Sequence, residues 1–177
     1  MKGAKWTVVL VLLLIISLGM NIYLGNQIRR RDQYTRQGFM WLANWALVDL
    51  NSFIKLVNDP NVDWNSPTFR LSLKQSIDDA TYAAQATGSV MSGLTTGPRW
   101  QVASGLNSLS FGLLQYRSMV DRIANAADPV TPDQQAQLKA LAAKLVAAGW
   151  PDKPLGTDDT QQWAQFGSVL QRLQELR

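Results

Sequence analysis

The chain has 177 residues, enough for one domain with a sizeable core and a short appendage. It contains no cysteine and no histidine, which excludes disulfides, thiolate chemistry, and histidine-based catalysis or metal binding. The formal charge of +4 arises before residue 33, in Lys2, Lys5 and residues 29–31 set against Asp32, and the remainder of the chain is neutral. The basic residues thus flank an apolar segment, which indicates membrane contact and no nucleic-acid partner.

The apolar segment, from Trp6 to Gly25, is about twenty residues long, enough for a helix to cross a hydrocarbon core of about 30 Å. It is longer than a typical signal-peptide core, and three arginines follow it, as at the end of a retained helix. We therefore expect residues 1–31 to be a single-pass signal-anchor whose partner is the lipid bilayer. The expected membrane-interface residues are Trp6, Tyr23, Arg29, Arg30 and Arg31.

The same segment leaves two alternatives open. Small residues at Ser17 and Gly19 are compatible with cleavage after Gly19, which would release the rest of the chain as a secreted protein. The basic residues on the two sides favour a cytoplasmic bulk domain, whereas the short basic tail ahead of the apolar run is typical of an export signal. We expect an extracytoplasmic bulk domain, with the cytoplasmic face as the alternative.

Past the arginines the pattern is helical throughout. We expect residues 32–177 to form an all-α antiparallel bundle of four to five helices, into which the anchor helix continues. Pro67, Pro98 and Pro132 each stand at an expected helix start, and Gly149 at an expected helix end. The helices are predicted near residues 35–58, 67–95, 98–127, 132–148 and 159–176.

Apolar residues in these helices recur every three or four positions, the coiled-coil-like spacing of a buried stripe. In the second bundle helix the stripe includes Ala80 and Ala84, whose small side chains allow a neighbouring backbone to come close. The predicted core positions are Met40, Ala43, Leu47, Leu50, Ile54, Val57, Leu73, Ile77, Ala80, Ala84, Thr87, Met91, Leu94, Val102, Leu106, Leu109, Leu113, Tyr116, Val120, Ile123, Leu138, Leu141, Ala142, Leu145, Val146, Trp163, Phe166, Leu170 and Leu173.

Tryptophans are the residues that most suggest an interaction surface. Trp41 and Trp45 lie one helical turn apart, and two interpretations remain: the pair widens the core face, or it forms an exposed aromatic patch. Trp64 and Trp150 stand in expected loops beside prolines, where they could contact a partner or cover an end of the bundle. The candidate partner-binding residues are Trp41, Trp45, Trp64 and Trp150.

Two patterns have the residue types of a catalytic or metal site. Ser52 and Lys55 match a Ser-x-x-Lys dyad, but the companion motifs of such enzymes are missing, so a solvated helix face is the favoured interpretation. Asp78 and Asp79 are neighbours in an expected helix, where successive side chains diverge by about 100°. We expect them to face water, and Asp158 and Asp159 to compensate a helix dipole.

The favoured function is a non-enzymatic interaction or scaffold protein, without cofactor or metal, that presents heptad faces and tryptophans at the membrane. Its expected partner is a protein or a second copy of the chain. The alternative is an extracytoplasmic small-ligand-binding or sensor-accessory domain, whose cavity would lie between the alanine-rich second helix and its neighbours.

Overall fold

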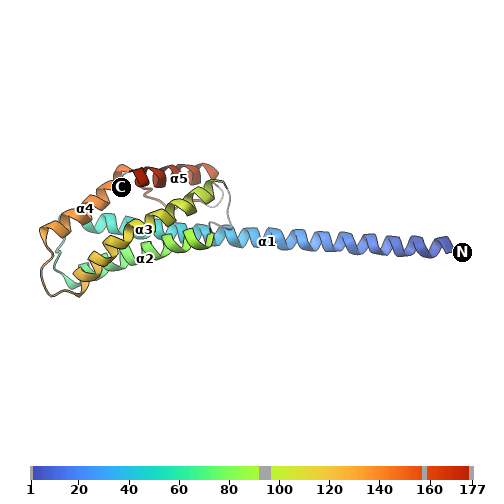
Figure 1. Ribbon diagram of the computed structural model, residues 1–177, viewed down its shortest axis with the longest axis horizontal. Helices are drawn as coiled ribbons and strands as arrows, with labels where there is room; N and C mark the ends of the chain where they lie inside the picture. The colour runs from blue at the N-terminus through green and yellow to red at the C-terminus, as the bar shows by residue number, and fades with distance from the viewer. Residues whose placement is uncertain (1, 92–96, 157–158, 176–177) are drawn as a thin grey trace. The chain divides into compact units, whose positions relative to one another are not determined.

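The computed structural model describes the backbone of residues 2–91, 97–156 and 159–175, and the side chains of residues 14, 16–89, 97–156 and 159–174. This part of the chain is all-helical and has no strand, which confirms the predicted fold class of a helical bundle. Its helices are α1 (Lys2–Asn58), α2 (Pro67–Met91), α3 (Pro98–Asn125), α4 (Pro132–Ala147) and α5 (Thr160–Glu175) (Figure 1).

The chain forms two units, Met1–Gln37 and Gly38–Arg177, and α1 contributes to both of them. The sequence had placed the division between residues 31 and 32. The first unit is helical, and the second contains the remainder of α1 together with α2 to α5. The core lies in this second unit.

Local signals define two of the helix starts in the second unit. Thr131 caps α4 through a capping box, since its hydroxyl accepts from the Gln134 N–H at 3.3 Å while the Gln134 side chain accepts from the Thr131 N–H at 2.9 Å. Asp159 caps α5, because its Oδ1 accepts from the N–H groups of Gln161 and Gln162, each at 3.0 Å. Helix α4 begins at Pro132, as predicted, and α5 begins at Thr160, one residue after its predicted start. Asp158 lies outside the described residues.

Gly149 ends α4 as expected, with a φ of +82° that L side chains rarely adopt. Its N–H donates to the carbonyl of Val146 at 2.9 Å, and the next N–H, of Trp150, donates to the carbonyl of Leu145 at 3.0 Å. These bonds satisfy carbonyl groups at the end of the helix. They also turn the chain so that the Trp150 indole reaches α1.

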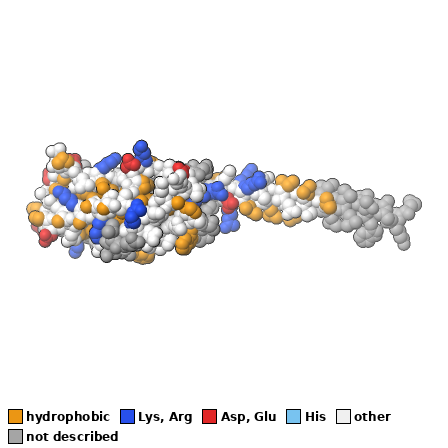
Figure 2. Space-filling view, turned by 90° about the horizontal axis from the view of Figure 1, so that it is seen from above, with side chains coloured by type: hydrophobic (Ala, Val, Ile, Leu, Met, Phe, Trp, Pro, Cys, Tyr) orange, Lys and Arg blue, Asp and Glu red, His pale blue; other side chains and the backbone are white. Residues whose placement is uncertain are grey.

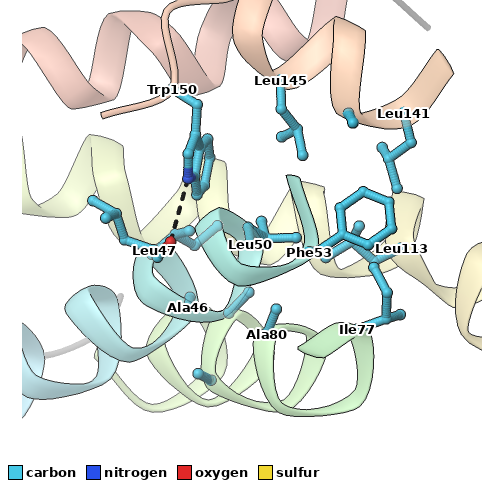
Figure 3. Close-up of a cluster of buried hydrophobic side chains, with 14 of the residues drawn as sticks. Ala46, Leu47, Leu50, Phe53, Ile77, Ala80, Leu113, Leu141, Leu145 and Trp150 are labelled. Carbon is cyan, nitrogen blue, oxygen red and sulfur yellow. Dashed lines mark hydrogen bonds between the residues drawn. The ribbon is translucent and has the colours of Figure 1, made fainter. Parts of the chain in front are cut away.

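The core surrounds α1 on several sides. Figure 3 shows Leu50 and Phe53 of α1 between Ile77 and Ala80 of α2 and Leu145 of α4. All five side chains are fully buried. A helix with neighbours on several sides buries more of its circumference than the narrow stripe of a two-helix contact.

That enclosure explains where the predicted stripe of α1 was too narrow. Phe39, Ala46 and Phe53 are fully buried although they lie outside the predicted stripe. Met40 and Ile54, which it did include, are only partly buried and pack at the edge of the core. The seven-residue spacing identified the centre of the buried face and missed its flanks.

Helix α3 approaches both α2 and α5 closely through small residues. Figure 1 shows α2 and α3 side by side, and the two are in contact along their lengths. A Cβ atom on Gly88 of α2 would lie 2.2 Å from the Cβ of Asn107 of α3, and one on Gly105 of α3 would lie 2.7 Å from the Cβ of Leu170 of α5. The expected close packing of Ala80 and Ala84 is also present, since both are fully buried.

The remaining stripes follow the prediction with one correction. Val146 of α4 is 58% exposed, because α4 contacts the bundle through a narrow face that contains Leu138, Leu141 and Leu145. Leu109, Tyr116 and Leu173 are partly buried at the edge of the core. Met91 and Leu94, which the sequence places in the core, lie outside the described side chains.

Candidate interaction surface

Three aromatic rings form a continuous row on the surface of the second unit. The ring centroids of Trp41 and Trp45, on α1, lie 4.8 Å apart, and those of Trp45 and Tyr82, on α2, lie 6.3 Å apart. Trp41 is 61% exposed and Tyr82 is 63% exposed, whereas Trp45 is partly buried against the core. We call these three residues the aromatic ladder. Val48, one helical turn beyond Trp45, adds an exposed apolar side chain to the same face.

Each of the two interpretations of the tryptophan pair holds for one residue: Trp45 widens the core face, and Trp41 is exposed. Tyr82 was absent from the sequence-based candidates. Its neighbours in α2 follow the buried stripe, and Tyr82 lies outside that stripe. Only the packing of α1 against α2 brings its ring beside Trp45.

A polar groove of about 500 Å³ lies between α1 and α2. It contains Asp49, one turn after Trp45, and Asp79, one turn before Tyr82, so it begins where the ladder ends. Burial, and then the neighbouring charge of Asp79, raise the pKa of Asp49 to about 6. Its Oδ2 is buried, and none of the described residues gives it a hydrogen bond. The groove residues are Asp49, Ser52, Lys55, Leu56, Asp59, Ser72, Gln75, Ser76 and Asp79.

Trp64 and Trp150, the two loop candidates, lie in the core and are each only 8% exposed. The Trp64 ring packs edge-on against Phe69, at 5.0 Å between centroids. The Trp150 indole donates from Nε1 to the carbonyl of Leu47 at 3.4 Å (Figure 3) and packs against Phe166. Because these contacts bury both rings, little of either ring is left to contact a partner.

The Ser-x-x-Lys pattern does not form a dyad. The Ser52 hydroxyl donates to the backbone carbonyl of Val48 at 3.1 Å, an ordinary bond one turn back along a helix. Lys55 is exposed on the same groove. Within the described residues, no bond joins the two side chains, so nothing there would activate the serine as a nucleophile.

The two adjacent aspartates have separate surroundings. Asp78 pairs with Lys74 and with Arg117 of α3, whose Nε lies 2.8 Å from its Oδ1. Lys74 also pairs with Asp121. The hydrogen bond to Asp121 and then the one to Asp78 raise the pKa of Lys74. Asp78 therefore links α2 to α3, while Asp79 faces the polar groove. Of the side chains that the structure describes, no three acidic groups are placed to hold a metal ion.

In the first unit, apolar side chains are exposed. Leu14, Met20 and Ile28 are more than half exposed, and Figure 2 shows hydrophobic side chains on the described surface of this segment beside a cluster of cationic ones. Tyr23 is exposed and its hydroxyl accepts a hydrogen bond from Gln27 at 2.8 Å.

The predicted interface arginines, Arg29, Arg30 and Arg31, are exposed. Trp6 lies outside the described side chains, as do the other residues of the apolar segment up to residue 13 and residue 15. Judged on the described residues alone, no helix is long and apolar enough to span a membrane.

No protein-family model matches the chain, and neither the curated proteins nor the solved structures contain a significant match to it.

Proposed function

We propose that this chain is a non-enzymatic interaction protein, held at a membrane by its amino-terminal segment, that presents the aromatic ladder to a protein partner. The observation that carries the proposal is the exposure of Trp41 and Tyr82 at the two ends of one row of rings. Exposed aromatic rings that adjoin each other are unusual on a surface that contacts only water.

The chemistry of the ladder suits a protein interface. Tryptophan and tyrosine are enriched among the residues that contribute most to protein binding, because they bury a large area with few rotatable bonds. Trp45 packs against the core and supports the rings on either side. The ladder is therefore ordered before a partner arrives, which lowers the entropy cost of association.

The anchor is supported by the sequence and by the exposure of side chains in the first unit. Apolar residues from Leu14 to Ile28 have no protein cover among the described residues, and three arginines follow them. A bilayer would remove the apolar side chains from water while the arginines contact lipid headgroups. The short basic tail at Lys2 and Lys5 supports an extracytoplasmic bundle.

Photo-crosslinking in native membranes tests the ladder. The full chain would carry a photoreactive amino acid at Val48, beside the ladder, and adducts would be resolved by mass. We expect one dominant adduct. The Trp41→Ser and Tyr82→Ser double variant should lower the yield of that adduct at least about tenfold, which corresponds to a loss of about 1.4 kcal/mol in binding free energy. An adduct of twice the mass of the chain would identify a second copy as the partner.

The matched control is Trp100→Ser, which removes a half-exposed tryptophan of α3 outside the ladder. Its adduct yield should equal that of the parent chain. An equal loss in the control, or an undiminished yield in the double variant, would contradict the proposal.

A further inference from the structure

A cleft of about 420 Å³ opens between α3, α4 and α5, on residues that neither the aromatic ladder nor the polar groove uses. Its volume lies toward the lower end of the range for small-molecule sites, about 300–1,000 Å³. Six leucines line it, and Figure 3 shows three of them, Leu113, Leu141 and Leu145, in the core. Leu113, Leu145 and Leu170 are fully buried, so the apolar surface open to a ligand comes mainly from the partly buried Leu109 and Leu173 and the exposed Phe111. The lining leucines are Leu109, Leu113, Leu141, Leu145, Leu170 and Leu173.

This location differs from the one that the sequence suggested. The alternative function placed a cavity beside the alanines of α2, but Ala80 and Ala84 are fully buried against their neighbours. Small side chains there let the neighbouring helices come close together. The cleft lies instead where α4 and α5, two shorter helices, meet α3.

The polar part of the cleft lining consists of Lys144, Tyr116 and two glutamines. Within the described residues, the side chains of Lys144 and Tyr116 have neither a hydrogen bond nor an ion pair, so their polar atoms are available to a ligand. Tyr116 is partly buried at the edge of the core and lines the cleft.

Charge determines the kind of head group that would fit. The three helical stretches that supply the lining, residues 105–116, 141–145 and 170–174, contain two cationic side chains and no carboxylate. One of these cations, Arg172, is already hydrogen-bonded within the protein, because it donates from Nε and Nη2 to the carbonyl of Ala148 at 3.0 and 2.7 Å. Lys144 remains as the cation that can pair with a ligand.

We infer that the cleft binds a single-chain anionic amphiphile such as a fatty acid, with its chain on the leucines and its carboxylate at Lys144. Burial of the chain supplies a favourable free energy in proportion to the apolar area removed from water. The ammonium group selects an anionic head over a neutral or cationic one. Binding of this kind requires neither the aromatic ladder nor a membrane anchor, so it can fail or succeed independently of the proposed function.

Titration of the full chain, held in amphipol, with octanoate labelled with ¹³C at its carboxyl carbon tests this site. We expect saturable binding, with a shift of the carboxyl resonance as it approaches the ammonium group. Octanol and octylamine also have eight carbon atoms, and they should bind at least about tenfold more weakly, which corresponds to a difference of about 1.4 kcal/mol in binding free energy. Empty amphipol corrects for partition of the probe.

Four variants separate the head-group contact from the apolar contact. Lys144→Gln should weaken the binding of octanoate about tenfold and leave the binding of octanol unchanged. Lys144→Arg should retain octanoate binding. Leu173→Trp should fill the cleft and abolish the binding of both probes. The control Lys153→Gln removes an exposed cation from the loop between α4 and α5 and should change nothing. Octanoate that binds no better than octanol, or equally well to Lys144→Gln, would overturn the inference, as would the absence of saturable binding.

Discussion

Arg70 of α2 donates from Nη1 to the carbonyl oxygen of Ala126 at 2.6 Å, and so joins the start of α2 to the end of α3. Its Nη2 donates to the carbonyl of Asp128 at 2.8 Å, and its Nε to that of Trp64 at 3.3 Å. The side chain is only 7% exposed. A cation suits this position because the carbonyls at the end of a helix lack partners and carry partial negative charge.

Replacement of Arg70 should destabilise the bundle strongly. Arg70→Met retains most of the side-chain length but leaves the buried or partly buried carbonyls of Trp64, Ala126 and Asp128 without the Arg70 donors, so we expect a loss of about 3 kcal/mol in the free energy of unfolding. Denaturant unfolding of the intact chain, followed by tryptophan fluorescence, measures it. Arg122→Met, which removes an exposed arginine from the last turn of α3, should change stability by less than about 0.5 kcal/mol. Equal effects of the two variants would show that the buried bonds of Arg70 contribute little.

Asp49 should make the stability of the bundle depend on pH. An unfolded aspartate titrates near 3.8, whereas the pKa of Asp49 in the folded chain is raised to about 6 by burial and by Asp79. Between these values the folded state keeps a proton that the unfolded state has lost, so the contribution of Asp49 to stability falls as the pH rises from about 4 to 6.

The variant Asp49→Asn removes that cost of ionisation. Since Asp49 is only half-buried, we expect Asp49→Asn to be more stable than the parent by about 1–2 kcal/mol at pH 7, and by much less at pH 4. Thermal unfolding at both pH values measures the difference. Asp152→Asn, in an exposed loop, is the control and should show no such dependence. A gain that is the same at both pH values would mean that ionisation of Asp49 is not its cause.

Close packing of α2 against α3 should make Gly88 intolerant of a side chain. The added methyl group of Gly88→Ala would overlap the Cβ and Cα of Asn107, so the two helices must separate, and we expect a loss of about 2–3 kcal/mol. Gly167→Ala, in α5, would meet Gln101 at an ordinary contact distance of 3.5 Å and should be neutral or slightly stabilising. Chemical denaturation compares the two, and a neutral Gly88→Ala would refute the close approach.

Retention of the amino-terminal segment can be measured on the mature protein. If the segment is a membrane anchor, the mature chain begins at or next to Met1 and remains in the membrane pellet after carbonate extraction, because about twenty apolar residues resist transfer to water. Amino-terminal sequencing together with extraction provides the readout. A mature chain that begins at Met20 would replace the anchor with a cleaved signal.

The location of the bundle can be tested with a single cysteine, because the natural chain has none. Ser118 of α3 faces solvent and is therefore suited to the label. We expect Ser118→Cys to react with a membrane-impermeant maleimide in whole cells, as an extracytoplasmic bundle requires. Labelling that appears only after lysis would place the bundle in the cytoplasm.

Much of the fold follows from local features of the sequence. The prolines at the starts of α2, α3 and α4, the capping box of Thr131 and the glycine at residue 149 each act through nearby backbone groups, so their effects can be predicted without knowledge of distant residues. The recurrence of apolar residues identified the centre of each buried face for the same reason. Side chains three or four positions apart share a helix face whatever the helix packs against.

The flanks of those faces and the candidate sites depend on contacts between helices. Phe39 and Phe53 are buried because α1 has neighbours on several sides. Trp150 is buried because the turn at Gly149 directs the Trp150 indole onto α1. Tyr82 joins the aromatic ladder only through the packing of α1 against α2. No sequence spacing encodes these distances, since they depend on how far and at what angle two helices approach.

The helical class, most helix boundaries and the contrast between an apolar, basic-flanked segment and a neutral remainder can thus be predicted from the amino-acid sequence alone, because they depend on composition and on interactions within a few residues. Packing between helices sets which aromatic rings are exposed, which aspartate is held partly out of water, and where a cleft opens. Each of these is a property of side chains from two or more helices brought together by packing, and the free energy of burial depends on that shared environment.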